Sequence, residues 1–480
     1  MEAINQVLSG ILMPVLLLSA GVLFCVRLRG FYFLHPIRFI KTLAEAGEGS
    51  GVSPFRALSQ ALAGTLGVGN MAGVATAIVA GGPGAILWMW ISALCAMSVK
   101  YAEVRLAVEH RRKGARGYYG GAMYYIQDLL TPRKSGAFAG TPSKKILPLG
   151  TVAGGIFALL CVINSLLTGN IVQMHAAAAV FPSLPPLILG GVVAAVAFVI
   201  ACGGAGKVSR VTMGLIPLLS GVYLLFSAWI LIRGWERLPG VLWEIVSSGL
   251  SFRAAAGGAG GFAITRAIRF GVTRGIFSNE AGCGTSPTAH AAASVKSPHH
   301  QGCFGIFEVF ADTIVLCTVT ALVILLSDGA SQGLDGIPLT LYAYTVGAGE
   351  WAGRCIGVSV ILFAFATVIC QTEYGKVAIG YLTQRPGPRR VYVAVCAAAT
   401  LLGTVIAPGM MWQWADLTVS LMTAVNVICL CIYWGPASLR LQSMGKRKRA
   451  RDSVCRSHPN PCSKKFLGVS GRMSRLNAQF

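Results

Sequence analysis

Residues 55–101 read FRALSQALAGTLGVGNMAGVATAIVAGGPGAILWMWISALCAMSVKY. This apolar stretch is long enough to cross a bilayer twice, because a spanning helix needs roughly 20 mostly apolar residues. Four glycines surround Asn70 in the first crossing: Gly64, Gly67, Gly69 and Gly73. Each costs about 1 kcal/mol relative to alanine inside a helix. Peptide groups freed in hydrocarbon need partners from protein, water or a ligand, so an interrupted helix indicates a midplane binding site of a transporter.

Two other interpretations of these glycines stay open. Gly69 and Gly73 form a GxxxG pair, which also serves as a close-packing face between membrane helices. Residues 67–72 fit the loose dinucleotide pattern G-x-G-x-x-[GA]. That pattern needs a preceding strand and a soluble βαβ unit, and here it lies inside one long apolar segment. We therefore expect ligand binding or helix packing at this position, and no nucleotide site.

The composition is that of an integral membrane protein. Of the 480 residues, 54% are hydrophobic and 12% charged, and the mean hydropathy is +0.66, whereas soluble domains carry about 25% charged residues. The net charge is +23, but the basic residues lie mostly in loops and in the tail. Since no nucleic-acid module interrupts the apolar spans, no nucleic-acid partner is predicted.

The apolar runs predict an all-α membrane protein with eleven transmembrane helices. One extra helix lies near residues 11–26, and ten core spans follow, at about 55–79, 85–108, 150–180, 186–202, 209–232, 258–294, 303–326, 354–382, 391–407 and 412–434. Positive charge follows the first helix and does not precede it, which places the amino terminus outside. Eleven spans then put the carboxyl terminus in the cytoplasm. The connection after the seventh core span, with Asp328, Asp335 and Glu350, is expected to be an outer loop.

This pattern divides the chain into three parts. Residues 1–54 hold the extra helix and a cytoplasmic linker, residues 55–434 form the transporter core, and residues 435–480 form a basic cytoplasmic tail. The tail has many basic residues against the single acid Asp452, so we expect it to be disordered and to orient the protein in the bilayer. Binding of anionic lipid head groups is the alternative role.

A second interrupted helix lies at residues 258–294, where glycines and Pro287 loosen the segment. Breaks in the first and the sixth core span are what two inverted repeats of five helices produce, here at about 55–232 and 258–434. Glu280 in this segment is expected to pair with one of the arginines before it.

The third core span is unusually polar for a membrane helix. Its polar residues are Asn164, Ser165, Thr168, Asn170 and Gln173. Several such groups on one span indicate a cavity, because polar side chains in the membrane are expensive. The Gln173 amide offers both an acceptor for an ammonium group and a donor for a carboxylate, so we expect it to line the substrate site.

These features resemble the alanine or glycine:cation symporters, also called the sodium:alanine symporters, over about residues 52–426. The matching motifs are GVGNMAGVATAIVAGGPGAILWMW, GAMYYI, GNIVQ, AIRFGVTRGIFSNEAG, SPTAHAAA and TALVIL. The resemblance implies a leucine-transporter-type 5+5 inverted repeat preceded by one extra helix. It also implies Na⁺-driven import of alanine, glycine or another small neutral amino acid across the inner membrane. No enzyme is expected, since no Ser/His/Asp set or metal cluster with suitable spacing occurs.

The substrate carboxylate is expected at peptide N–H groups of the first break, because helix N-termini favour anions. The residues concerned are Gly67, Val68, Gly69 and Asn70. Freed carbonyls are expected to hold Na⁺, an ion that prefers oxygen. Resemblance to the sodium site of this fold adds the hydroxyl of Thr367, and Asn70 and Asn279 are expected to reach the ion or the substrate.

The chain departs from the family pattern at several positions. Val68 occupies a position where the family usually has Ser or Thr. The family pattern F-A-F-[ST]-T-I-L-G-W-S-Y-Y-G corresponds to FAFATVICQTEYG at residues 363–375 of this chain. Within it, the departures include Ala366, Cys370, Gln371 and Glu373. Loss of a hydroxyl at Ala366 predicts weaker Na⁺ binding or a shift toward H⁺ coupling. Gln371 in place of tryptophan suggests a substrate-site residue for a polar substrate such as glutamine or serine. A transport-inactive relative that binds a ligand is the further alternative.

Overall fold

The computed structural model describes residues 5, 7–45, 51–115, 117–131, 149–250, 259–406, 409 and 411–432. Contacts divide the chain into two units, Met1–Leu430 and Cys431–Phe480, and the first contains nearly all of the described residues. The prediction of a disordered tail over residues 435–480 lies outside the described residues.

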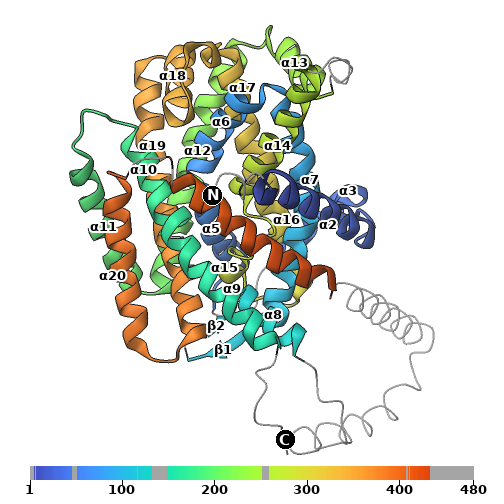
Figure 1. Cartoon of the computed structure of the whole chain (residues 1–480), viewed down its shortest axis with the longest axis vertical. Helices are drawn as coiled ribbons and strands as arrows, with labels where there is room; N and C mark the ends of the chain where they lie inside the picture. The colour runs from blue at the N-terminus through green and yellow to red at the C-terminus, as the bar shows by residue number, and fades with distance from the viewer. Residues whose placement is uncertain are drawn as a thin grey trace, which may run out of the picture. The chain divides into compact units, whose positions relative to one another are not determined.

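Before residue 251, the described residues form helices, the connections between them and one short hairpin (Figure 1). Its helices are η1 (Leu8–Leu12), α2 (Met13–Arg27), α3 (Phe31–Leu34), α4 (Pro36–Ala44), α5 (Pro54–Thr65), η2 (Val68–Asn70), α6 (Ala72–Gly81), α7 (Gly84–Glu109), α8 (Ala122–Leu130), α9 (Leu149–Leu166), η3 (Leu167–Ile171), α10 (Val172–Ala178), α11 (Pro186–Cys202), α12 (Ala205–Arg233) and α13 (Leu238–Leu250). The hairpin pairs β1 (Arg112–Gly114) with β2 (Gly117–Tyr119) in antiparallel register, Arg112 opposite Tyr119.

The second part repeats the helical character. Its helices are α14 (Ala259–Asn279), α15 (Pro287–His290), α16 (Pro298–Val309), η5 (Phe310–Cys317), α17 (Thr318–Leu326), η6 (Gly329–Gln332), α18 (Gly336–Ala348), α19 (Glu350–Leu382), α20 (Pro386–Gly403) and a last helix, Met411–Ile432. The connection expected as an outer loop therefore contains a helix, α18. Its sequence is apolar from Ile337 onward, and Asp335 caps its start by accepting a hydrogen bond from the Gly336 N–H.

Seven helices of the described residues are long and apolar enough to cross a membrane, and the bent pair of α5 with the segment Val68–Gly81 makes an eighth. The predicted count of eleven spans stays a prediction. Two elements show why length and composition alone identify fewer than eleven spans. α11 has only 17 residues, and α14 carries Arg266, Arg269 and Arg274 within its apolar sequence.

Helix α7 is the element against which much of the fold packs. It contacts α2, α14 and α16, and most of its second half is buried. Gly271 permits the close approach of α14, because a Cβ there would lie 2.2 Å from the Ala85 carbonyl oxygen. Gly82, with φ of 73°, forms the turn that joins α6 to α7. Glycine is favoured at such positive φ values.

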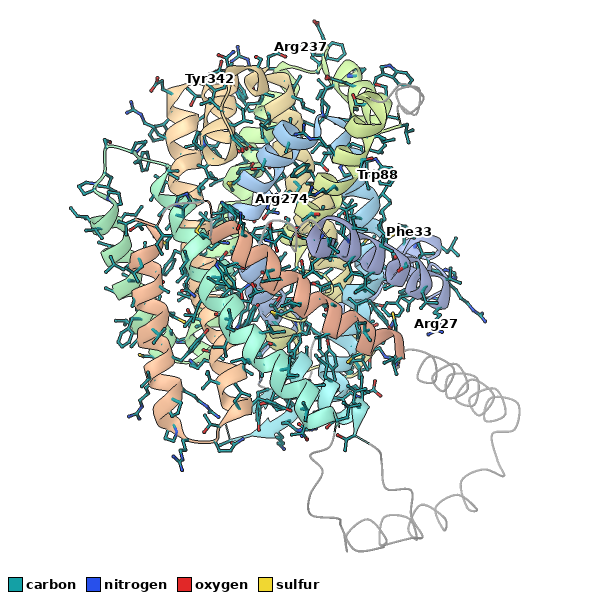
Figure 2. All side chains as sticks on the ribbon, viewed as in Figure 1. Arg27, Phe33, Trp88, Arg237, Arg274 and Tyr342 are labelled. Atoms are coloured by element: carbon teal, nitrogen blue, oxygen red, sulfur yellow. The ribbon has the colours of Figure 1, made fainter. Side chains whose placement is uncertain are left out.

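The last helix packs beside α14. There Arg274 of α14, labelled in Figure 2, has a guanidinium nitrogen 3.9 Å from the Asp416 carboxylate and its guanidinium carbon 5.2 Å from the Trp412 ring centre. Figure 1 also shows α11 and α20 side by side, in agreement with their contacts.

Candidate functional site

The interrupted first core helix forms the centre of the site. α5 ends at Thr65, and the segment Val68–Gly81 continues in a direction that differs by 63°. Residues 68–70 form a single 3₁₀ turn between the two helical parts. The residues of the turn are buried. The structure thus confirms the break that the glycines around Asn70 predict.

Gln173 meets the break from a neighbouring helix. Its side-chain oxygen Oε1 accepts a hydrogen bond from the Val68 N–H at 3.1 Å, and its Nε2 donates to the Thr168 carbonyl at 3.3 Å. Gln173 follows a π-helical turn, η3, and such turns are frequent at functional sites. The amide therefore supplies a partner to a freed peptide group, which is what irregular backbone at membrane depth requires.

Gly67 lies tightly between Gln173 and Thr367. A Cβ at Gly67 would come within 2.6 Å of Gln173 Oε1 and 2.7 Å of Thr367 Oγ1. Gly69 is also close to a neighbour, with its Cβ position 3.2 Å from the Ser278 Cα, whereas a Cβ at Gly73 would meet no described heavy atom within 4 Å. The GxxxG pair is therefore not a continuous packing face, and the close contact is at Gly67.

Hydroxyl and carbonyl oxygen atoms lie close together where α19 packs against the end of α5. The Thr367 hydroxyl donates toward the Ala63 carbonyl at 3.0 Å and toward the Phe363 carbonyl at 3.1 Å. Hydroxyl and carbonyl oxygens are the ligands that hard cations prefer. The neighbouring Ala366 is fully buried and adds only a methyl group. The residues at this point thus fit a small cation such as Na⁺.

A small cavity adjoins the same break. Its volume is about 10 Å³, and its lining residues are Leu66, Gly67, Asn70, Met71, Tyr223, Leu316 and Phe363. A cavity of this size holds about one water molecule, so an amino acid fits there only when the lining residues move apart. Asn70 contributes an amide side chain to the lining of this cavity. Its oxygen Oδ1 is buried without a hydrogen-bond partner among the described residues.

Of the predicted site residues, Gly67 and Asn70 line this cavity, and the others lie near the break but outside its lining: Val68, Gly69, Gln173, Asn279, Thr367 and Gln371. Asn279 Nδ2 donates to Thr313 Oγ1 at 3.0 Å, and Asn279 Oδ1 accepts from the Ala281 N–H at 2.9 Å, which closes the end of α14. Gln371 Nε2 donates to Glu280 Oε1 at 2.8 Å. Val68 contributes its peptide N–H to Gln173, while its side chain packs in the apolar core. The geometry brings together Gly67, Asn70, Gln173 and Thr367.

The expected pairing of Glu280 with an arginine is wrong. Glu280 accepts hydrogen bonds from Gln371 and Thr285, and none of the described arginines lies within ion-pair distance of it. The reason is a reversal of the backbone after α14. Glu280 itself has φ of 48°, and the turn directs its side chain toward α19, whereas Arg274 one and a half turns earlier faces Asp416.

Sequence reasoning missed a buried charged network behind the break. Lys100 Nζ lies 3.5 Å from Glu308 Oε1 and donates to the Glu280 carbonyl at 3.2 Å. Glu308 Oε2 is 2.9 Å from His290 Nε2. Sequence reasoning also missed the buried Asp312, whose Oδ1 accepts a hydrogen bond from Asn70 Nδ2 at 2.8 Å. The available signal was an ionisable residue inside an apolar span, which by default marks a functional position.

Comparison with known proteins identifies the family. The sequence matches the "Sodium:alanine symporter family" over residues 1–456. The chain belongs to the sodium:alanine symporter family. It is 33% identical over 453 residues to the "Probable sodium/glutamine symporter GlnT" of Bacillus subtilis (strain 168), with 93% of this chain and 90% of that protein covered. It is 34% identical over 448 residues to the "Sodium/alanine symporter AgcS" of Methanococcus maripaludis, with 90% and 94% covered.

A solved structure supports the fold of this sodium:alanine symporter family member. The crystal structure of MhsT in complex with L-phenylalanine aligns with a TM-score of 0.51 and 13% identity, and covers 82% of this chain and 91% of that one. The similarity agrees with the expected leucine-transporter-type fold. The family and these relatives are transporters, and not enzymes.

Proposed function

We propose that the protein is a Na⁺-coupled symporter that imports a small neutral amino acid, alanine or glycine, across the inner membrane. The observation that carries this proposal is the buried break at residues 66–71, where Gln173 and Thr367 converge on Gly67 beside a small cavity. The proposal includes an outer amino terminus, a cytoplasmic carboxyl terminus and two inverted repeats of five helices.

The ion site supported by the contacts lies between α5 and α19. A Na⁺ there would replace the hydrogen bond between Thr367 and Ala63, since the hydroxyl can rotate and present its oxygen while the carbonyl already points at it. The ion would tie the two helices together. Ion binding therefore stabilises the arrangement in which Gly67 touches Gln173 and Thr367, which is the arrangement that forms the cavity wall.

The substrate site supported by the contacts lies at the turn itself. A zwitterion that leaves water must have both of its charges paired. Its carboxylate fits the N-terminal end of α6, where peptide N–H groups and the helix dipole favour an anion. The apolar lining from Leu66, Met71, Leu316 and Phe363 suits a short aliphatic side chain. Because the same turn touches ion and substrate, binding of one stabilises the conformation that binds the other.

Gln371 and the name of one relative favour a second candidate, a polar substrate such as glutamine. The Gln371 oxygen Oε1 is buried and has no partner among the described residues, and a relative is named a probable sodium/glutamine symporter. Gln371 does not line the cavity, which is why alanine or glycine is the first proposal.

Uptake of labelled alanine into proteoliposomes tests the proposal. We expect an imposed inward Na⁺ gradient to drive accumulation, unlabelled alanine and glycine to compete best, and a proton gradient alone to drive none. Stronger competition by glutamine or serine would favour the polar-substrate alternative. Accumulation driven only by protons would replace Na⁺ with H⁺, and ligand binding without accumulation would indicate the transport-inactive alternative.

A further inference from the structure

Two short helices, α3 and α4, follow the first apolar helix and are held against the rest of the bundle. Gly30, with φ of 55°, turns the chain out of the end of α2. The Tyr32 hydroxyl donates to the Leu94 carbonyl of α7 at 3.3 Å. The Phe31 ring centre lies 5.5 Å from that of His299 in α16. This segment therefore has a fixed inner side and lies directly after a helix long enough to span the membrane.

Helix α4 turns one side to the protein and exposes an apolar side. Thr42 is buried, and Leu43 packs against the hydrophobic core. Ile37 and Ile40 are three residues apart and share a helix face, and they are 71% and 62% exposed. Leu34, at the end of α3, adds a third apolar residue that is 70% exposed. Neighbouring exposed apolar residues of this kind mark a surface that interacts with another molecule or with a membrane.

Basic side chains flank this apolar surface. Residues 27–45 contain four basic residues against one acid, Glu45. Arg29, Arg38 and Lys41 are exposed, and none of them forms an ion pair with an acid in the part of the chain that the structure describes. The Arg27 guanidinium nitrogen Nη1 is buried and has no hydrogen-bond partner among the described residues. The segment thus offers positive charge to an anionic ligand.

The position of the segment indicates what covers it. Val22 and Val26 of α2 are 55% and 70% exposed, as expected on the lipid side of a spanning helix. Figure 2 shows Arg27 and Phe33 on the same side of the molecule, at the outer end of α2 and α3. A helix with an apolar face beside Lys and Arg lies in the head-group region of a bilayer, and anionic lipids attract its charges. We propose that α3 and α4 lie in the membrane interface and bind the phosphate head groups of anionic phospholipids.

The charges of the segment make other occupants poorer. In a two-fold symmetric dimer the same patch meets itself, so Arg38 and Lys41 of one copy would approach the same residues of the other copy and repel them. A soluble acidic protein would compete for the apolar residues with the lipid that already surrounds α2. A phospholipid supplies both an anionic head group and apolar chains to one surface.

The lipid-binding segment is in contact with the helices that lead to the transport site. α4 contacts α16, and α16 contacts α5. Just before α16, the Ser294 N–H donates to the carbonyl of Val52 at 2.7 Å, and Val52 lies just before α5. Lipid that holds α4 against α16 therefore restrains the start of α5, the helix that ends at the break. An effect of anionic lipid on transport rests on the proposed function, whereas lipid binding itself does not.

The test compares four forms of the full chain: wild type, Arg38→Gln/Lys41→Gln, Ile37→Ser/Ile40→Ser and Arg385→Gln/Arg390→Gln. The last is the matched control, because its two arginines are exposed at the start of α20 and the charge change is the same. Purified protein is titrated with phosphatidylglycerol, phosphatidylcholine or inorganic phosphate, and the thermal midpoint is recorded at low and high choline chloride. Na⁺-driven alanine uptake is then measured in proteoliposomes with and without phosphatidylglycerol.

We expect phosphatidylglycerol to stabilise the wild type at lower concentration than phosphatidylcholine, with a difference that shrinks as salt rises. Arg38→Gln/Lys41→Gln should weaken the apparent affinity for phosphatidylglycerol by about 25-fold, about fivefold for each basic residue. Ile37→Ser/Ile40→Ser should weaken the affinity for both lipids and keep the salt dependence. The control should match the wild type.

Three results overturn the lipid site. Equal losses in the control and in Arg38→Gln/Lys41→Gln favour general surface charge, and equal stabilisation by inorganic phosphate favours a free anion. A dimer mass by light scattering that falls to the monomer mass in Ile37→Ser/Ile40→Ser, with unchanged lipid titrations, favours a second copy. Uptake that ignores phosphatidylglycerol overturns only the link to α5. Intact lipid binding without Na⁺-driven uptake in any liposome contradicts the proposed function and supports the lipid site.

Discussion

Replacement of Gly67 by alanine tests the geometry of the break. The added Cβ would lie 2.6 Å from Gln173 Oε1 and 2.7 Å from Thr367 Oγ1, closer than side-chain carbon atoms approach oxygen in folded proteins. Overpacking of this kind costs about 1–3 kcal/mol. Gln173 could swing away to relieve it, but the Val68 N–H would then lose its acceptor, and an unsatisfied buried donor costs about 1–3 kcal/mol. Both routes penalise the arrangement proposed to bind ion and substrate.

If this penalty reduces the coupling free energy between ion and substrate, the effect of Na⁺ on the affinity for the amino acid becomes about 5- to 150-fold smaller. The assay is the initial rate of Na⁺-driven alanine uptake, together with alanine-induced thermal stabilisation of the purified protein at saturating Na⁺. Gly73→Ala is the control, because its Cβ would meet no described heavy atom within 4 Å and alanine is favoured in a helix interior by about 1 kcal/mol. Wild-type uptake by Gly67→Ala, or a loss confined to Gly73→Ala, would refute the reasoning.

Substitutions at three further positions test other parts of the account. Thr367→Val removes the proposed ligand hydroxyl and should weaken Na⁺ binding about tenfold, whereas Thr367→Ser should retain it, as Na⁺ titration of uptake will show. Glu308→Gln leaves Lys100 buried without its counter-charge, so we expect about 3–5 kcal/mol of destabilisation; a thermal midpoint equal to wild type would contradict this. Burial raises the pKa of Asp128, but its hydrogen bonds with Arg112 outweigh burial and hold that pKa below the ordinary value. Stability from such a group is present above the ordinary pKa and is lost as pH falls through the folded value, so Asp128→Asn should lower the thermal midpoint at neutral pH and the difference should shrink toward acid pH.

The break in the first core helix is predictable from sequence because its cause is local. Glycines weaken a helix wherever they occur, and those around Asn70 stand together in one apolar span. The contribution of Gln173 is predictable in part, since a polar amide on an apolar span requires a partner. Its actual partner, the Val68 N–H, depends on how α10 packs against the turn.

The misses arise where tertiary structure decides the partner. Glu280 follows several arginines in the chain, yet the reversal after α14 turns it toward Gln371. Asp312 reaches Asn70 across 242 positions of sequence, a separation that no local pattern encodes. α18 is hidden in a connection whose acids suggest a loop, although Asp335 is in fact its N-terminal cap.

The central claim is that the peptide groups of residues 66–71, and not charged side chains, hold a dehydrated amino acid beside its ion. The most direct measurement is a high-resolution structure determined with Na⁺ and alanine present. We expect density for the amino acid against the turn at Gly67 and Asn70, with an ion between the Ala63 carbonyl and the Thr367 hydroxyl. Density for the amino acid elsewhere, beside a continuous helix over residues 64–73, would contradict the account.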